Sequence, residues 1–196
     1  MPDYKKAEDY IFNRLKNELS PTLYYHGYHH TYDVMNAAMT LAAAEKITLE
    51  EKQLLRVAVA FHDAGFIYIY KNHEMKSCEM AREALPALQF SEEALQKICG
   101  MIMATKLPQK PTNLLEQIIA DADLDYLGRR DVETTALSLF EELKHYSNLN
   151  NEKAWNKIQV DFLTTHSYFT KSSNKLRTPA KQQYLSRLVG KYLNKA

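Results

Sequence analysis

The sequence predicts an all-α protein. Glycine and proline, which interrupt regular helices, are scarce, with five glycines and six prolines in 196 residues. Apolar residues recur at the spacing i, i+3, i+4, i+7, which gathers them on one face of a helix; Leu54, Val57, Ala58 and Phe61 follow it. A chain of this length buries roughly 70% of its unfolded surface. We therefore expect it to fold without disulfides or a structural metal.

Nine helices are expected, and capping residues mark several of their starts. Thr48 and Glu51 form a capping-box pattern, and Ser91 precedes two glutamates that suit a first helical turn. Residues 106–111 contain two prolines and predict a loop, and residues 66–70, although β-prone in composition, predict a packed loop. The expected helices, in order, are 4–19, 30–46, 49–62, 74–85, 92–104, 113–126, 131–146, 152–168 and 179–193.

The charges are balanced overall but not along the chain. The net charge of +1 gives no general signal for nucleic acid or an anionic membrane. After Asp161 no acidic residue follows, and the basic residues there suit a solvated helix, with binding of an anionic substrate or of nucleic acid as the alternatives. They are Lys171, Lys175, Arg177, Lys181, Arg187, Lys191 and Lys195. We expect no nucleic-acid partner.

The cysteines and the hydropathy point to the cytoplasm. Cys78 and Cys99 are the only cysteines and form no CxxC motif, which is typical of buried thiols in a reducing compartment. No apolar run approaches the roughly 18 residues of a membrane span, and no signal-peptide pattern opens the sequence. We expect a cytoplasmic protein with no membrane association; a homodimer is compatible with the sequence.

Histidines and aspartates are arranged as candidate metal ligands. His62 and Asp63 are adjacent at the end of an apolar helix, where the chain leaves helical geometry, so both side chains can reach one ion. Asp121, Asp123 and Asp125 end another apolar helix. Carboxylates beside a core are costly to desolvate unless they are paired or bind a cation. We expect Asp125 to face water, and helical periodicity leaves Asp121 and Asp123 both open.

These segments together resemble the HD superfamily of metal-dependent phosphohydrolases. Residues 25–31 read YHGYHHT, residues 60–65 read AFHDAG, residues 73–77 read HEMKS and residues 122–124 read ADL. The resemblance runs from about residue 25 to residue 144. It implies a single HD-type helical domain with a C-terminal helical extension. The expected division is an N-terminal helix within 1–24 that packs on the domain, the HD core over 25–146 and an extension over 147–196, basic at its end.

The resemblance implies that His30, His62, Asp63 and Asp123 hold the metal, and it favours Asp123 over Asp121. His73 matches an additional ligand of dinuclear members, but no histidine lies near residues 103–106, where the next one is expected. We therefore expect one ion per site. Two imidazoles and two carboxylates favour Mn, Fe, Co, Ni or Zn over Mg.

The implied reaction is attack of a metal-activated water on a small phosphate ester, with a nucleotide as the expected substrate. Asp63 is also the candidate to orient that water. Candidate substrate-binding residues are His26, His73, Glu74 and Lys106, although a helix cap or a solvated lysine also explains the last three. A cyclic nucleotide or dinucleotide phosphodiesterase and a non-catalytic metal- and nucleotide-binding module are the alternatives. Trp155, Gln159, Phe162 and His166 share one helix face, where core packing is favoured over closing the pocket.

Overall fold

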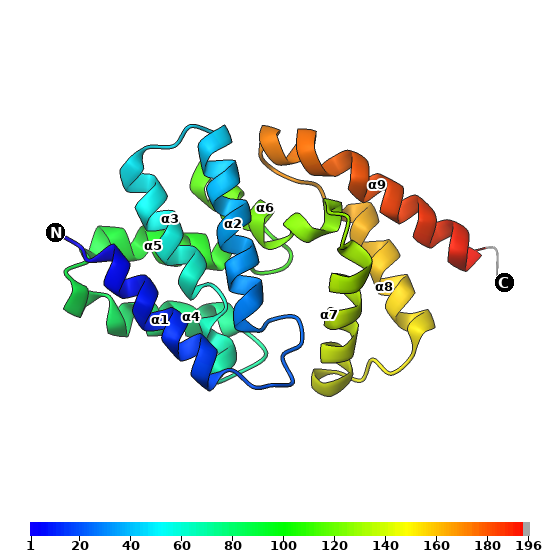
Figure 1. Ribbon diagram of the computed structural model, residues 1–196, viewed down its shortest axis with the longest axis horizontal. Helices are drawn as coiled ribbons and strands as arrows, with labels where there is room; N and C mark the ends of the chain where they lie inside the picture. The colour runs from blue at the N-terminus through cyan, green and yellow to red at the C-terminus, as the bar shows by residue number, and fades with distance from the viewer. Residues whose placement is uncertain (194–196) are drawn as a thin grey trace.

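The computed structural model describes residues 1–193, and the described chain contains helices and no strand, which confirms the all-α prediction (Figure 1). The α-helices are α1 (Tyr4–Glu18), α2 (Tyr28–Ala44), α3 (Leu49–Phe61), α4 (His73–Ala84), α5 (Glu92–Ala104), α6 (Leu114–Asp123), α7 (Val132–Tyr146), α8 (Glu152–Thr165) and α9 (Lys171–Leu193). Three short 3-10 helices join them, η1 (Ala64–Ile67), η2 (Pro86–Leu88) and η3 (Asp125–Gly128). None of the described helices is both long and apolar enough to cross a bilayer.

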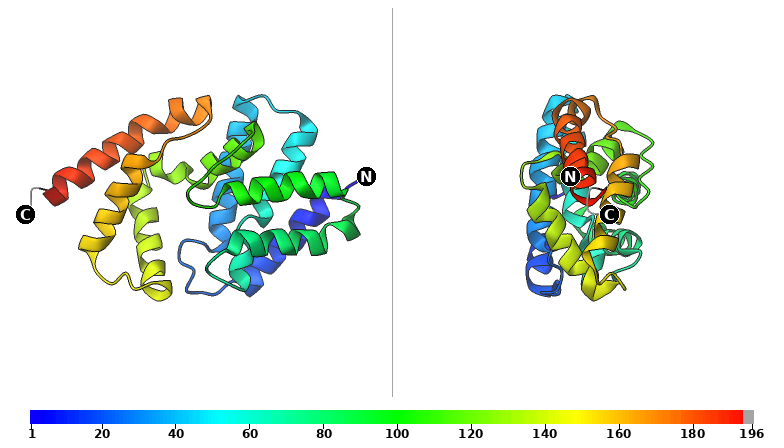
Figure 2. Two further views of the ribbon diagram at one scale, coloured as in Figure 1. Left: turned by 180° about the vertical axis from the view of Figure 1, so that it is seen from behind. Right: turned by 90° about the vertical axis from the view of Figure 1, so that its right-hand side faces the viewer.

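The helices form two groups that lie side by side (Figures 1 and 2). Helices α1–α6 enclose the main hydrophobic core, and α3 runs through its middle in contact with α1, α2, α5 and α6. Leu55, Val57 and Phe61 of α3 are completely buried. Two smaller clusters hold α7, α8, α9 and η3 together. The carboxyl end of α3 is therefore a fixed point inside the first group.

The expected capping residues make the hydrogen bonds that their chemistry predicts. Thr48 Oγ1 accepts from the Glu51 amide at 3.2 Å, and the Glu51 carboxylate accepts from the Thr48 amide at 2.8 Å, which completes the capping box of α3. Ser91 Oγ accepts from the Ala94 amide at 3.2 Å at the start of α5. These bonds satisfy amide groups that a helix leaves unpaired in its first turn.

The last helix begins well before the predicted start at residue 179. Pro179 lies inside α9, and the helix starts at Lys171. Thr170 caps it, because its Oγ1 accepts from the Ser173 amide at 3.1 Å. A proline suits the first turn of a helix, but here it lies in the interior of one. Helix α6 likewise ends at Asp123 rather than residue 126, and η3 follows it.

Three of the basic residues after Asp161 form contacts within the fold rather than standing free for a ligand. Arg177 forms a two-pronged ion pair with Asp125, at 2.7 and 3.0 Å, and Asp125 is only 4% exposed, so the expectation that it faces water is wrong. Lys181 is buried and donates to the His166 carbonyl oxygen. Arg187 pairs with Glu133 at 3.2 Å. Lys195 lies outside the described residues.

The surroundings of His166 predict a pH dependence of stability. Burial and the nearby Lys181 charge lower the pKa of His166 to about 4. The unfolded chain has a histidine pKa of about 6.5, so it binds a proton that the folded chain does not bind in the interval between these values. We expect the free energy of unfolding to fall as the pH drops through this window.

Urea unfolding measured at about pH 7 and about pH 4.5 checks this linkage. The His166→Asn variant is expected to lose less stability than the wild type between the two conditions. Equal losses in both proteins would show that His166 contributes nothing to the acid sensitivity.

Candidate metal centre

Four side chains from three separate segments meet at one point of the interior. His30 comes from α2, His62 and Asp63 from the end of α3, and Asp123 is the last residue of α6. Nε2 of His30 lies 3.1 Å from Asp123 Oδ1 and 3.5 Å from Asp63 Oδ2, and Nε2 of His62 lies 3.2 Å from Asp63 Oδ2. His30, His62 and Asp123 offer ligand atoms that all lie within 4.8 Å of one another. The fold therefore brings together all the residues expected to bind metal.

A sharp turn after α3 directs His62 and Asp63 toward this point. Asp63 has left helical geometry, with φ −104° and ψ 7°. Ser77 of α4 stabilises the turn through two hydrogen bonds to its backbone. Its Oγ donates to the His62 carbonyl oxygen at 2.7 Å and accepts from the Gly65 amide at 2.8 Å. Adjacent residues can therefore present a nitrogen and an oxygen to one ion.

The buried donor atoms are arranged for a cation. Nδ1 of His62 lies 2.8 Å from the Val59 carbonyl oxygen, which only accepts, so Nδ1 carries a proton and Nε2 faces the cluster, where its lone pair is available to a metal ion when the ring is neutral. Hydrogen bonding of the second ring nitrogen in this way is typical of metal-bound histidines. Nε2 of His62 and Oδ2 of Asp63 are buried, and no described residue gives either atom a hydrogen bond. A metal ion would satisfy both atoms.

The electrostatics of the cluster favour positive charge. Burial acts to raise the pKa of Asp123, but the hydrogen bond with His30 and the nearby His62 imidazole outweigh it and lower the pKa to about 2. Burial also acts to raise the pKa of Asp63, but the charge of His62, together with His73 and His26, outweighs it and holds the pKa well below its usual value. Both carboxylates are therefore ionised, and they attract either protons on the imidazoles or a metal ion.

Asp121 and Asp123 occupy different environments. Asp121 is completely buried and accepts three hydrogen bonds from the start of α9. The donors are the Phe169 amide at 2.8 Å, the Thr170 amide at 2.8 Å and the Thr170 hydroxyl at 2.7 Å. Asp121 thus holds α9 against α6, and only Asp123 faces the imidazoles.

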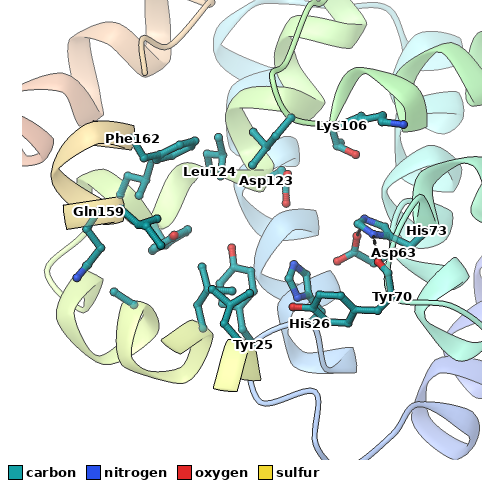
Figure 3. A pocket seen from close by; sticks show the side chains of 18 of the residues that line it. Tyr25, His26, Asp63, Tyr70, His73, Lys106, Asp123, Leu124, Gln159 and Phe162 are labelled. Carbon is teal, nitrogen blue, oxygen red and sulfur yellow. Dashed lines mark hydrogen bonds and ion pairs between the residues drawn. The ribbon is translucent and has the colours of Figure 1, made fainter. Parts of the chain in front are cut away.

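A cavity of about 580 Å³ opens directly from the cluster (Figure 3). Asp63 and Asp123 lie in its wall together with the four residues that the sequence indicated for substrate binding, His26, His73, Glu74 and Lys106. Trp155, Gln159 and Phe162 of α8 also line it, whereas His166 lies outside. None of the described basic residues after Asp161 reaches this cavity.

Two comparisons with known proteins agree with this arrangement. The sequence model of the HD domain matches residues 27–125, which is half of the chain. The chain belongs to the HD-domain family. A crystal structure of a predicted HD superfamily hydrolase from an uncultured Thermotogales bacterium has a similar fold, with a TM-score of 0.64 at 18% identity over 99% of this chain and 93% of that one. A search of curated proteins gives no match.

The family is one of metal-dependent hydrolases, and the His-Asp pair that gives the HD domain its name is supported here by α4. His73, the first residue of α4, places Nε2 at 3.4 Å from Asp63 Oδ1 and at 3.6 Å from Glu74 Oε1. Its Nδ1 lies 3.2 Å from the Tyr70 carbonyl oxygen. The Phe66 ring stacks on the imidazole, with the two ring centroids 3.8 Å apart. Asp63 therefore turns one oxygen to His30 and His62 and the other to His73.

Glu142 of α7 is a contributor to the HD site that the sequence did not reveal. Its carboxylate is completely buried and accepts from the backbone amides of Tyr25 and His26 at 2.8 and 2.9 Å, from His26 Nδ1, and from the Tyr70 hydroxyl at 2.9 Å. It fixes the His26 ring in the cavity wall. In the sequence Glu142 is one of two adjacent glutamates on an amphipathic helix, a pattern that usually indicates solvent exposure, so no signal distinguished it.

Gly65 allows α4 to approach the HD turn. A Cβ at this position would lie 2.0 Å from the His73 carbonyl oxygen. We expect Gly65→Ala to lower the free energy of unfolding by about 2 kcal/mol and to weaken Mn²⁺ binding, because His73 must move away from Asp63. Chemical unfolding and calorimetric Mn²⁺ titration measure the two effects.

Gly190→Ala is the matched control for this substitution. Its Cβ would meet nothing within 4 Å, and the residue lies inside α9. We expect this change to stabilise the protein by about 0.5–1 kcal/mol and to leave Mn²⁺ binding unaltered. Wild-type stability and metal affinity in the Gly65→Ala variant would refute the close-packing argument.

Proposed function

We propose that this protein is a metal-dependent phosphohydrolase that cleaves a small phosphate ester with an activated water. One observation carries the proposal. Nitrogen and oxygen donors of His30, His62, Asp63 and Asp123 converge at the charged end of a cavity large enough for a small ligand. A buried donor set of this kind that also opens to a cavity suits catalysis better than a closed structural site.

The four side chains fit one divalent cation with mixed nitrogen and oxygen ligands, so Mn, Fe, Co, Ni or Zn is favoured over Mg. Such an ion would supply Lewis-acid activation of water and would neutralise charge on the phosphoryl group. With four protein ligands, such an ion would still have room to bind solvent and substrate.

The residues around the cluster have roles that follow from their positions. Asp63, through the oxygen that faces His73, orients the attacking water. His26 in the cavity wall donates a hydrogen bond to a phosphoryl oxygen. His73, whose ring nitrogens face Tyr70 and Asp63, contributes positive charge beside the phosphate and holds the Asp63 carboxylate. Lys106 lies in the same wall, where its Nζ donates to Asn72 Oδ1 at 3.0 Å, and it supplies positive charge beside the phosphate. Glu74 would repel a phosphate, so it acts by holding His73.

Activity on two chromogenic esters tests the proposal. p-Nitrophenyl phosphate and bis-p-nitrophenyl phosphate are supplied with the metal-free protein and with Mn²⁺, Co²⁺ or Ni²⁺. We expect metal-dependent release of nitrophenol from the monoester by the wild type and by His145→Ala, an exposed histidine of α7 outside the cavity. Preference for the diester would favour a phosphodiesterase. Metal binding without turnover of any ester would favour a non-catalytic binding module.

A further inference from the structure

The cavity has two chemically different ends. The candidate ligands Asp63 and Asp123 lie at one end together with His26, His73 and Lys106 (Figure 3). The other end, which we call the apolar arm, extends between α7 and α8, and Phe162, Leu124 and Gln159 face Asp63 and His73 across the cavity (Figure 3). The side chains that form its apolar wall are Leu124, Leu139, Leu143, Trp155, Ile158 and Phe162.

The amide side chain that α8 contributes to the arm is already bonded within the protein. Gln159 is 8% exposed, its Oε1 accepts from the Tyr184 hydroxyl at 2.7 Å, and its Nε2 donates to Asn156 Oδ1 at 3.2 Å. Among the residues that the structure describes, α7 and α8 place no charged side chain in the wall. Sugar hydroxyls or the edge of a nucleobase would lose water there without gaining equivalent partners.

We propose that the organic group of the substrate is apolar, so that the protein hydrolyses phosphate monoesters of apolar alcohols or phenols in preference to nucleotides. This inference rests on the proposed phosphohydrolase function. The phosphate lies at the metal cluster, and the organic group fills the apolar arm. The oxygen of one water bonds to phosphorus, the bond from phosphorus to the ester oxygen breaks, and the departing oxygen receives a proton from that water. The products are the free alcohol and inorganic phosphate.

Substrate preference tests the inference. The value of kcat/KM is measured with Mn²⁺ for hexyl phosphate, glycerol phosphate and adenosine 5′-monophosphate, all of which release an alkyl alcohol. We expect hexyl phosphate to exceed both others by at least about tenfold, because its apolar carbons are buried in the arm. Ile158→Asn is expected to remove most of this advantage, and because Ile158 is 47% exposed the change is compatible with folding.

Leu137→Asn is the matched control, because Leu137 is an apolar residue of α7 that is 56% exposed and lies outside this cavity. It is expected to retain the wild-type preference. A higher kcat/KM for adenosine monophosphate or glycerol phosphate would overturn the apolar-substrate inference and leave the phosphohydrolase proposal standing.

A binding measurement separates failure of this inference from failure of the proposed function. If no ester is turned over, the phosphohydrolase proposal is wrong, and calorimetry with hexylphosphonate and methylphosphonate still tests the arm. We expect hexylphosphonate to bind at least about tenfold more tightly, and Ile158→Asn to abolish the difference. Quenching or a shift of the emission of Trp155, the single tryptophan of the chain, would report occupancy of the arm. Equal affinities for the two phosphonates would overturn the inference.

Discussion

Replacement of His62 by alanine is expected to weaken Mn²⁺ binding by at least about 100-fold and to reduce any metal-dependent esterase activity to background. His62 is completely buried, and its Nε2 faces Asp63 and Asp123 without a hydrogen-bond partner among the described residues. Removal of the imidazole therefore takes one ligand from the centre and leaves the carboxylates of Asp63 and Asp123 with one fewer neighbouring imidazole. Calorimetric Mn²⁺ titration and the nitrophenyl phosphate assay measure the two losses.

His29→Ala is the control for this substitution. His29 is next to the candidate ligand His30 in the sequence, but its side chain is exposed and does not line the cavity. The variant should bind Mn²⁺ and turn over ester as the wild type does. If His62→Ala kept wild-type Mn²⁺ affinity while remaining folded, His62 would not be a ligand.

Asp121 and Asp123 are expected to give opposite phenotypes when each is replaced by alanine. Asp121→Ala leaves the amides of Phe169 and Thr170 without their acceptor in a buried position, so the free energy of unfolding should fall by about 3 kcal/mol. Asp123→Ala removes a carboxylate that faces His30 and His62, so Mn²⁺ affinity should fall by at least about 100-fold while the fold persists. Urea unfolding and Mn²⁺ titration of both variants separate the two roles.

A different result would contradict the role assigned to each of the two aspartates. Loss of Mn²⁺ binding in a fully stable Asp121→Ala protein would make Asp121 the ligand and would reverse the assignment. A large loss of stability in Asp123→Ala, with Mn²⁺ affinity unchanged, would make Asp123 a structural residue.

The local features of the fold were predictable from the sequence, because they depend on residues close together in the chain. The capping box at Thr48 and Glu51, the apolar face of α3 and its end at the His62-Asp63 pair are all local patterns. The start of α9 was not predictable from local patterns. It is set by Asp121, far away in the sequence, whose carboxylate binds the backbone of Thr170.

The sequence predicted which residues could bind the metal, but not which side chains surround them in the folded protein. Motifs indicated His30, His62, Asp63 and Asp123, whereas the choice between Asp121 and Asp123 required the contacts of each side chain. Glu142 contacts His26 from a helix that comes more than a hundred residues later in the chain. Two adjacent glutamates, Glu141 and Glu142, usually indicate a solvent-facing surface, so the sequence did not mark Glu142 as buried. The apolar arm arises because the α8 face, expected mainly to pack into a core, also lines the cavity.

Crystals grown with Mn²⁺ and measured for anomalous scattering test the central claim most directly. We predict one strong peak in contact with Nε2 of His30 and of His62 and with carboxylate oxygens of Asp63 and Asp123, at bond lengths of about 2.2 Å. Absence of a peak at these four residues in crystals saturated with Mn²⁺, or a peak held elsewhere in the molecule, would contradict a metal centre at this point of the fold.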